Sequence, residues 1–119
     1  MATKSEDDLR ELIKQNLVDV EFIEKKMFGK FAFFIEGNMF TGVHQSYLFL
    51  RLSSDDRDAA LSKDSITVFE PRKGMVLREY VVLLDNILDN KSKLKDLFRK
   101  SVSYVSSLPP KYSKNKTSQ

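Results

Sequence analysis

The chain has 119 residues, which is enough for one domain with its own core and too few for two domains of ordinary size. It contains no cysteine, so disulfides, thiolate-bound zinc, iron–sulfur clusters and thiol nucleophiles are excluded. Three of the 20 basic residues lie in residues 111–119, which hold no acid, and the other 17 equal the 17 acidic residues in number. A uniformly basic surface that would follow nucleic-acid phosphates is therefore not predicted.

The chain opens on mostly polar and acidic residues, and no apolar run typical of a signal peptide follows them. The longest apolar runs have four or five residues, far fewer than the roughly 20 needed to span a bilayer. The absence of cysteine fits a reducing compartment. We therefore expect a cytoplasmic protein without a membrane anchor.

The first predicted element is a helix that begins after Ser5. Ser5 is a suitable N-cap, and the three acidic residues after it place negative charge at the positive end of the helix. Leu9, Leu12, Ile13 and Leu17 follow at helical spacing and predict one apolar face.

Residues 20–52 are rich in β-branched and aromatic side chains and are interrupted by short polar breaks. Three short turns in about thirty residues leave no room for crossover connections, so the pattern predicts an antiparallel meander. We expect a tight turn at residues 36–38, where Gly37 and Asn38 accept a positive φ, and a second turn at residues 44–46. The expected strands span residues 20–28, 31–35 (covered on both faces), 39–43 and 47–52.

The second half begins with a short predicted helix that Ser53 or Ser54 caps and that runs to about residue 62. Two strands, 65–69 and 75–83, follow on either side of a turn at residues 71–74, and a helical turn is expected at 85–88. The last helix has the clearest periodicity and ends before Pro109 and Pro110. Its apolar stripe contains Leu94, Leu97, Phe98, Ser101, Val102, Val105 and Leu108.

This order (helix, three or four strands, helix, two strands, helix) predicts an α+β fold with two layers. An antiparallel sheet of about five or six strands would have its inner face covered by the long helices. We expect residues 5–110 to form a single domain. Residues 111–119 are expected to be a disordered basic tail, because their composition buries too little apolar surface to become ordered.

No catalytic or cofactor-binding constellation is present in the sequence. His44 is the single histidine, and it is interpreted as an ordinary surface residue in a turn, so neither a hydrolase triad nor a metal site is predicted. The adjacent acids Asp7 and Asp8, like Asp55 and Asp56, stand at predicted helix starts, where the helix dipole explains them. The four glycines are too scattered for a phosphate-binding loop. We therefore predict no enzyme activity, no cofactor and no metal ion.

One segment alternates basic and large apolar residues next to a turn. Its candidate partner-contact residues are Lys25, Lys26, Met27, Phe28 and Lys30. A contact loop is one interpretation, with the lysines for an acidic partner or phosphate and the apolar residues as anchors. The other is a half-buried strand with lysines on its outer face and the apolar side chains in the core.

Several short motifs together resemble the TfoX N-terminal domain family, the amino-terminal half of TfoX/Sxy-type competence regulators. The similarity extends from about residue 18 to residue 108, and its specificity comes from the combination and order of the motifs. They are Lys26-Met27-Phe28-Gly29, Glu36-Gly37-Asn38-Met39-Phe40, Tyr47-Leu48-Phe49-Leu50-Arg51, residues 55–60 and the helix 94–105.

The resemblance implies a helix-flanked antiparallel sheet similar to secretion-chaperone-like domains. It also implies no known enzymatic activity and a co-regulatory role through protein contacts. It supplies no catalytic or ligand-binding residue that transfers to this chain.

The favoured hypothesis is a non-catalytic regulatory module, such as a transcriptional co-regulator, that binds a protein partner or forms a homodimer. A second hypothesis is an enzyme or carrier of a small molecule, with a pocket between sheet and helices that Tyr47 or Tyr80 lines. A third is weak, nonspecific binding of nucleic acid, although no predicted helix is expected to carry basic residues along one face. The body residues for this third hypothesis are Lys25, Lys26, Lys30, Arg72 and Lys73.

Overall fold

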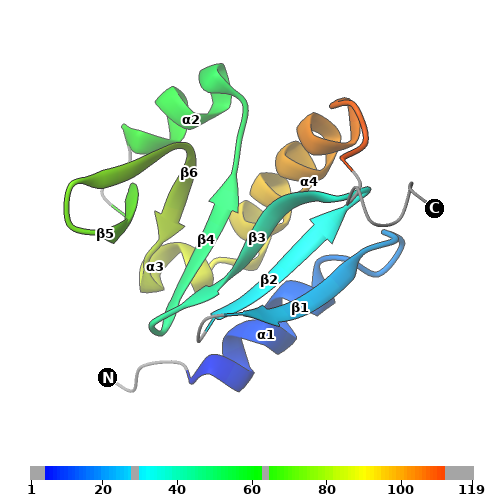
Figure 1. Cartoon of the computed structure of the whole chain (residues 1–119). Helices are drawn as coiled ribbons and strands as arrows, with labels where there is room; N and C mark the ends of the chain where they lie inside the picture. Colours follow the sequence, from blue (N-terminus) through cyan, green and yellow to red (C-terminus); the bar gives the residue numbers. More distant parts are fainter. Residues whose placement is uncertain (1–4, 28–29, 63–64, 112–119) are drawn as a thin grey trace.

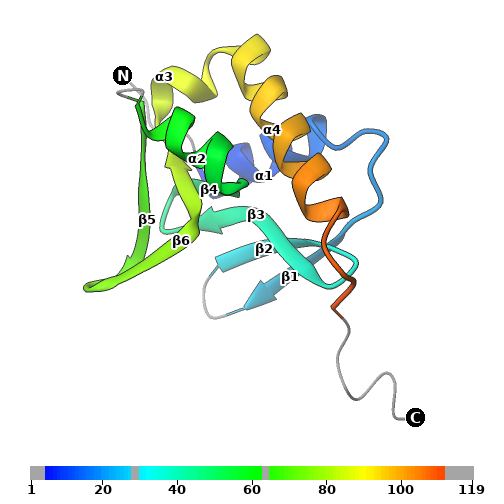
Figure 2. The same ribbon diagram turned by 90° about the horizontal axis from the view of Figure 1, so that it is seen from above.

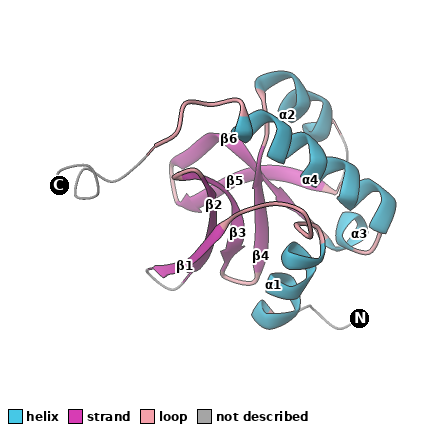
Figure 3. Ribbon diagram, turned by 90° about the vertical axis from the view of Figure 1, so that its right-hand side faces the viewer, coloured by secondary structure: helices cyan, strands magenta, loops and turns pink. Residues whose placement is uncertain are grey.

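The computed structural model describes residues 5–27, 30–62 and 65–111, which form four helices and six strands (Figure 1). In chain order these are α1 (Glu6–Gln15), β1 (Ile23–Met27), β2 (Lys30–Ile35), β3 (Asn38–His44), β4 (Tyr47–Arg51), α2 (Ser54–Leu61), β5 (Ile66–Arg72), β6 (Met75–Leu83), α3 (Asp85–Leu88) and α4 (Lys91–Ser106). The strands form one antiparallel sheet with the order β1-β2-β3-β4-β6-β5. The helices lie on one face of this sheet (Figures 2 and 3). The predicted α+β fold is confirmed.

The helices begin where the sequence places their caps. In α1 the Ser5 hydroxyl accepts a hydrogen bond from the Asp8 N–H at 3.1 Å, and the Asp8 carboxylate accepts one from the Ser5 N–H at 3.2 Å. This reciprocal capping box satisfies two amides that the helix itself leaves unpaired. Ser53 caps α2 through its hydroxyl, which accepts a hydrogen bond from the Asp56 N–H at 3.2 Å.

The first strand begins three residues later than predicted, at Ile23 rather than residue 20. After α1 the chain turns once more, because the Val20 N–H donates to the Leu17 carbonyl at 3.1 Å. This turn places Leu17 in the core and leaves residues 21 and 22 to lead into β1.

Three hairpin turns within the described residues differ from the prediction in their positions. Positive φ angles fall on Glu36 (48°) and Gly37 (84°), so Asn38 does not occupy the turn but begins β3. The second turn consists of Gln45 and Ser46, so the expectation that His44 lies in a turn is wrong. A two-residue turn with both φ angles positive matches the twist of the flanking strands, and for this reason each turn is confined to two residues. The third predicted turn, residues 71–74, is likewise shorter, because β5 extends to residue 72.

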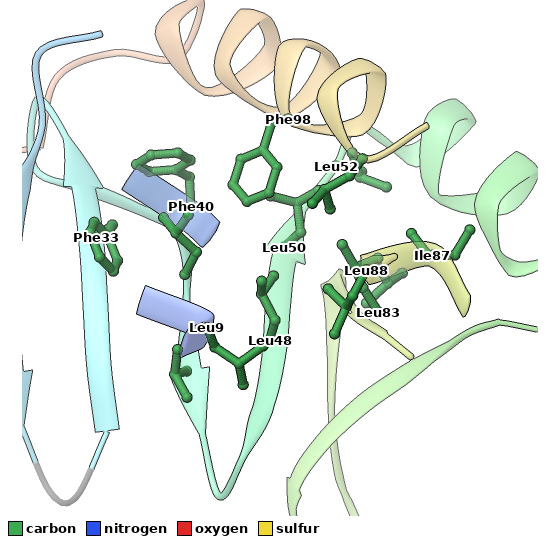
Figure 4. Close-up of a cluster of buried hydrophobic side chains, with 14 of the residues drawn as sticks. Leu9, Phe33, Phe40, Leu48, Leu50, Leu52, Leu83, Ile87, Leu88 and Phe98 are labelled. Carbon is green, nitrogen blue, oxygen red and sulfur yellow. The ribbon is translucent and has the colours of Figure 1, made fainter. Parts of the chain in front are cut away.

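The main core lies between the sheet and the helices (Figure 4). Phe33 of β2, Phe40 of β3 and Phe98 of α4 are buried there, together with leucines of β4 such as Leu50. The predicted stripe of α4 is confirmed, since Leu94, Phe98, Ser101 and Val105 are buried. Large apolar side chains therefore fill the space between the two layers.

A smaller apolar cluster covers part of the opposite face of the sheet. The ring of Phe69 from β5 stacks on that of Phe49 from β4, with ring centroids 4.7 Å apart and planes 7° apart. Val82 of β6 completes the buried part of this cluster. Strand β2 is covered only in part on its two faces, because Ala32 and Phe33 are buried whereas Phe34 is half-buried.

The chain after α4 returns to the β2–β3 turn. The Asn38 side-chain amide donates to the Pro109 carbonyl at 3.0 Å, and the Lys111 N–H donates to the Glu36 carbonyl at 2.7 Å. The rest of the predicted tail, residues 112–119, lies outside the described residues. Within the described ranges, no helix is both long and apolar enough to cross a membrane.

Candidate protein-interaction surface

Strand β1, which contains most of the predicted contact segment, is an edge strand. It pairs with β2 on one side, and no other described segment pairs with its outer side (Figure 1). An edge strand presents a row of unpaired backbone N–H and C=O groups, to which an extended segment of another chain adds as a further strand.

The register shows which backbone groups point outward. The Ile35–Asn38 pair closes a two-residue turn and is therefore hydrogen-bonded between β2 and β3. Counting back along β2, the alternation of an antiparallel ladder directs the backbone of Ala32 toward β1, where its partner is Lys25. The next residue, Lys26, consequently directs its N–H and C=O away from β2.

The two lysines of β1 project from opposite faces of the sheet, as successive strand residues must. Lys25 shares the helix-free face with Phe34, and its Nζ lies 5.4 Å from the centre of that ring. Lys26 lies on the helical face, with its Nζ 5.5 Å from the centre of the Phe31 ring. Both side chains are exposed, and their contacts with the rings hold the ammonium groups close to the edge.

The rest of the predicted contact segment is less well defined. Lys30 begins β2 on the same face as Lys25 and is half-buried. The backbone of Met27 ends β1, but its side chain and the whole of Phe28 lie outside the described residues. The structure therefore brings Lys25 and Lys30 to one face and separates them from Lys26.

Glu24 fastens β1 to the first helix. Its carboxylate accepts a hydrogen bond from the Arg10 Nε at 2.7 Å and lies 3.6 Å from the Lys14 Nζ. The Arg10 guanidinium also lies over the Phe31 ring, 4.2 Å from its centre. Partial burial raises the pKa of Glu24, but the hydrogen bond and charge of Arg10, together with Lys14, outweigh it and leave that pKa below its ordinary value. Glu24 is thus ionised and already paired, so Lys25 and Lys26 set the charge that the edge presents.

A large apolar side chain stands exposed beside these lysines. Ile23 is 57% exposed and pairs in register with Phe34, which places it on the helix-free face near Lys25. An exposed β-branched residue next to a free strand edge offers an apolar anchor to an added strand. The edge therefore combines backbone hydrogen-bonding groups, an anchor and positive charge.

The other predicted candidates do not join this surface. Arg72 ends β5 and Lys73 follows it, at the opposite edge of the sheet from β1, so the five basic residues considered for nucleic acid form no single patch. Tyr47 is half exposed, and the Tyr80 hydroxyl donates to the Met39 carbonyl at 2.9 Å.

His44 is half-buried in β3 rather than an ordinary surface residue. Its ring meets the Phe69 ring edge-on, with centroids 5.7 Å apart. Neither ring nitrogen has a hydrogen-bond partner among the described residues.

One basic feature of the helices was missed by the sequence analysis. Helix α4 carries the exposed side chains Lys91, Lys95 and Arg99, spaced by four residues and hence aligned along the helix. The expectation that no helix carries basic residues along one face is wrong. The four-residue spacing is visible in the sequence, but the helix was interpreted from its apolar stripe alone, as an element of the core.

Residues 5–104 match the family model of the TfoX N-terminal domain. The chain belongs to this family. The match begins at the N-cap of α1 and ends in the last turn of α4, so it takes in every strand of the sheet. Comparison with curated proteins gave no match, and comparison with solved structures gave none either.

Membership of the TfoX N-terminal domain family suggests a regulatory, competence-related role, and the family is not a known enzyme family. Among the residues that the structure describes, no three histidine, aspartate or glutamate side chains gather in a group suited to a metal ion.

Proposed function

We propose that this chain is a non-catalytic regulatory module that binds a protein partner through the outer edge of β1. The observation that carries the proposal is the unpaired edge with exposed Lys25 and Lys26 and the exposed Ile23 beside it. Family membership supports a regulatory role. The specific role that we propose is that of a transcriptional co-regulator. We place this function in the cytoplasm, in keeping with the cysteine-free sequence.

The charge of the edge selects the partner. Two β1 edges from two copies would bring lysines together, and like charges opposite each other destabilise a strand pair. A partner strand with acidic side chains would instead pair favourably with Lys25 and Lys26, whereas Glu24 is occupied by Arg10. The proposed partner is therefore a different protein that contributes an extended acidic segment, and a homodimer is the alternative.

A proline at position 26 tests the edge. Lys26→Pro removes an outward-facing N–H and no hydrogen bond to β2, and proline is tolerated on an edge strand in that orientation. Lys26→Thr is the matched control, because it removes the same charge and keeps the N–H. Both tagged variants and the parent protein are used to capture partners from lysate of the native cell, and mass spectrometry identifies the proteins retained.

We expect Lys26→Pro to lose a partner that the parent and Lys26→Thr retain, with melting temperatures showing that all three proteins are folded. If all three capture the same proteins, the β1 edge is not the binding surface. Size-exclusion chromatography over a range of concentrations tests self-association. If the chain forms a dimer that Lys26→Pro abolishes, the partner at the β1 edge is a second copy of the chain and not an acidic protein.

A further inference from the structure

Two hollows lie between α2 and α4 on the helical side of the molecule. Figure 2 shows these two helices side by side, away from β1. The hollows have volumes of about 590 Å³ and about 540 Å³, and neighbouring residues of α2 line them, Asp56 the first and Arg57 the second. Together they are called the groove below. The first lies between the C-terminal half of α2 and the N-terminal half of α4, and the second between the start of α2 and Tyr104 near the end of α4.

A row of residues along α4 contributes to both hollows. Lys93, Leu97, Lys100 and Tyr104 follow at positions i, i+4, i+7 and i+11, and all four line the groove. This spacing places them in one row along the helix. The row from Lys93 to Tyr104 is about 17 Å long at the rise of an α-helix.

The floor of the groove is apolar. Ala60 of α2, Ile66 of β5 and Ile87 of α3 form part of the first hollow and are buried beneath it, and half-buried Leu97 stands beside them. In the second hollow, Val76 of β6 is 44% exposed. An apolar floor of this kind favours an occupant with apolar side chains of its own.

The walls carry an excess of positive charge. Asp96 is shared by Lys100 and Arg99, and Glu79 is paired with Arg51 at 2.5 Å. The six cations that line the two hollows are Arg57, Arg78, Lys93, Lys95, Arg99 and Lys100, whereas the three carboxylates that line them are Asp56, Glu79 and Asp96.

Three of the six cations have no ion pair with any residue in the described part of the chain. They are Arg78, Lys93 and Lys95. Exposed, unpaired cations beside apolar side chains attract a ligand that has both carboxylates and apolar groups.

We propose that the groove between α2 and α4 binds an amphipathic helix of a partner protein, with its apolar stripe on the floor and acidic side chains on both flanks. A helix is the chosen occupant because α2 and α4, on the two sides of the groove, already bond their own backbone groups and therefore offer an extended peptide no ladder. A helix satisfies its backbone internally and presents only side chains. Nucleic acid fits less well, since Asp56 and Asp96 in the groove would face its phosphates.

This surface is distinct from the β1 edge and does not depend on it. The test uses a fluorescein-labelled peptide of about 14 residues, about 21 Å long as a helix, with leucine at helical spacing and glutamate on both flanks. One control peptide has the same composition in scrambled order, and a second has glutamine in place of glutamate. Fluorescence anisotropy measures the binding of each peptide to the full chain.

Three variants locate the binding. Ala59 is exposed and lines the first hollow, so Ala59→Tyr fills the groove without disturbing the core and should weaken binding by about tenfold or more. Lys93→Glu should weaken it by about fivefold or more through charge reversal in the groove. Lys91→Glu is the matched control, because Lys91 is exposed on the same helical turn but does not line the groove, and it should leave binding unchanged.

The proposal stands if the designed peptide binds more tightly than both control peptides and the variants behave as stated. Equal weakening by Lys91→Glu and Lys93→Glu, or equal binding of the scrambled peptide, would overturn it in favour of nonspecific charge attraction. If the peptide does not bind, and a fluorescent DNA duplex binds with an affinity that Lys93→Glu lowers, the proposal is overturned and the groove is a nucleic-acid site. Lys26→Pro should leave peptide binding unchanged, so this result is separable from that of the β1 edge.

Discussion

Replacement of Phe98 by alanine should unfold much of the population of this protein under mild denaturant. Phe98 is 1% exposed and belongs to the core between α4 and the sheet. A buried phenylalanine hides on the order of 150–250 Å². At about 25 cal/mol per Å², the loss of about 150 Å² of burial corresponds to about 4 kcal/mol, within the range of about 3–5 kcal/mol seen for such truncations.

The expected loss is a large part of the total, because single domains are stable by only about 5–15 kcal/mol. Urea unfolding followed by circular dichroism gives the free energy of unfolding of the parent and the variant, and similar slopes would show that both expose a similar surface when they unfold. Phe98→Leu keeps most of the volume and should lose no more than about 1.5 kcal/mol.

Ser103→Ala is the surface control, since Ser103 is exposed on the same helix and its replacement should change stability by less than about 0.5 kcal/mol. A loss below about 1 kcal/mol for Phe98→Ala would refute the assignment of this side chain to the core. The stripe of α4 would then face solvent or a partner.

Three further predictions concern single interactions. Glu24→Gln should be less stable than the parent at neutral pH and equally stable in strong acid. The pKa of Glu24 is lowered in the folded state, so the stability that its carboxylate contributes disappears as the pH falls from 4.5 through that lowered pKa. Urea unfolding at a series of pH values measures the difference. Tyr80→Phe should cost about 1 kcal/mol by loss of a hydrogen bond to β3. Because burial raises the pKa of Tyr80, the parent should lose more stability than the variant as the pH rises above 10.0, which urea unfolding at a series of pH values measures. A chain that ends after Lys111 should melt within about 2 °C of the full chain, whereas one that ends after Pro110 loses the bond from the Lys111 N–H and should melt a few degrees lower by calorimetry.

The sequence by itself determined the features that depend on neighbouring residues. The cap at Ser5, the apolar stripe of α4 and the tight turns between β2, β3 and β4 follow from side-chain chemistry and spacing over a few positions. These local preferences were enough to predict the order of elements, the α+β class and the resemblance to the TfoX N-terminal domain family. They also singled out the lysines of β1, although not the fact that Lys25 and Lys26 stand on an edge.

Only the tertiary structure decided which strands are neighbours and which surfaces are free. Strand β6 lies between β4 and β5, which leaves β5 and β1 at the two edges of the sheet. A bulge between β2 and β3 leaves Phe40 without a partner in the ladder and buries it in the core. The groove between α2 and α4 joins residues such as Ala59 and Lys93 that are far apart in the chain. Contacts of this kind depend on how the sheet twists and how helices pack on it, and the energy of such long-range packing has no signature in a short window of sequence.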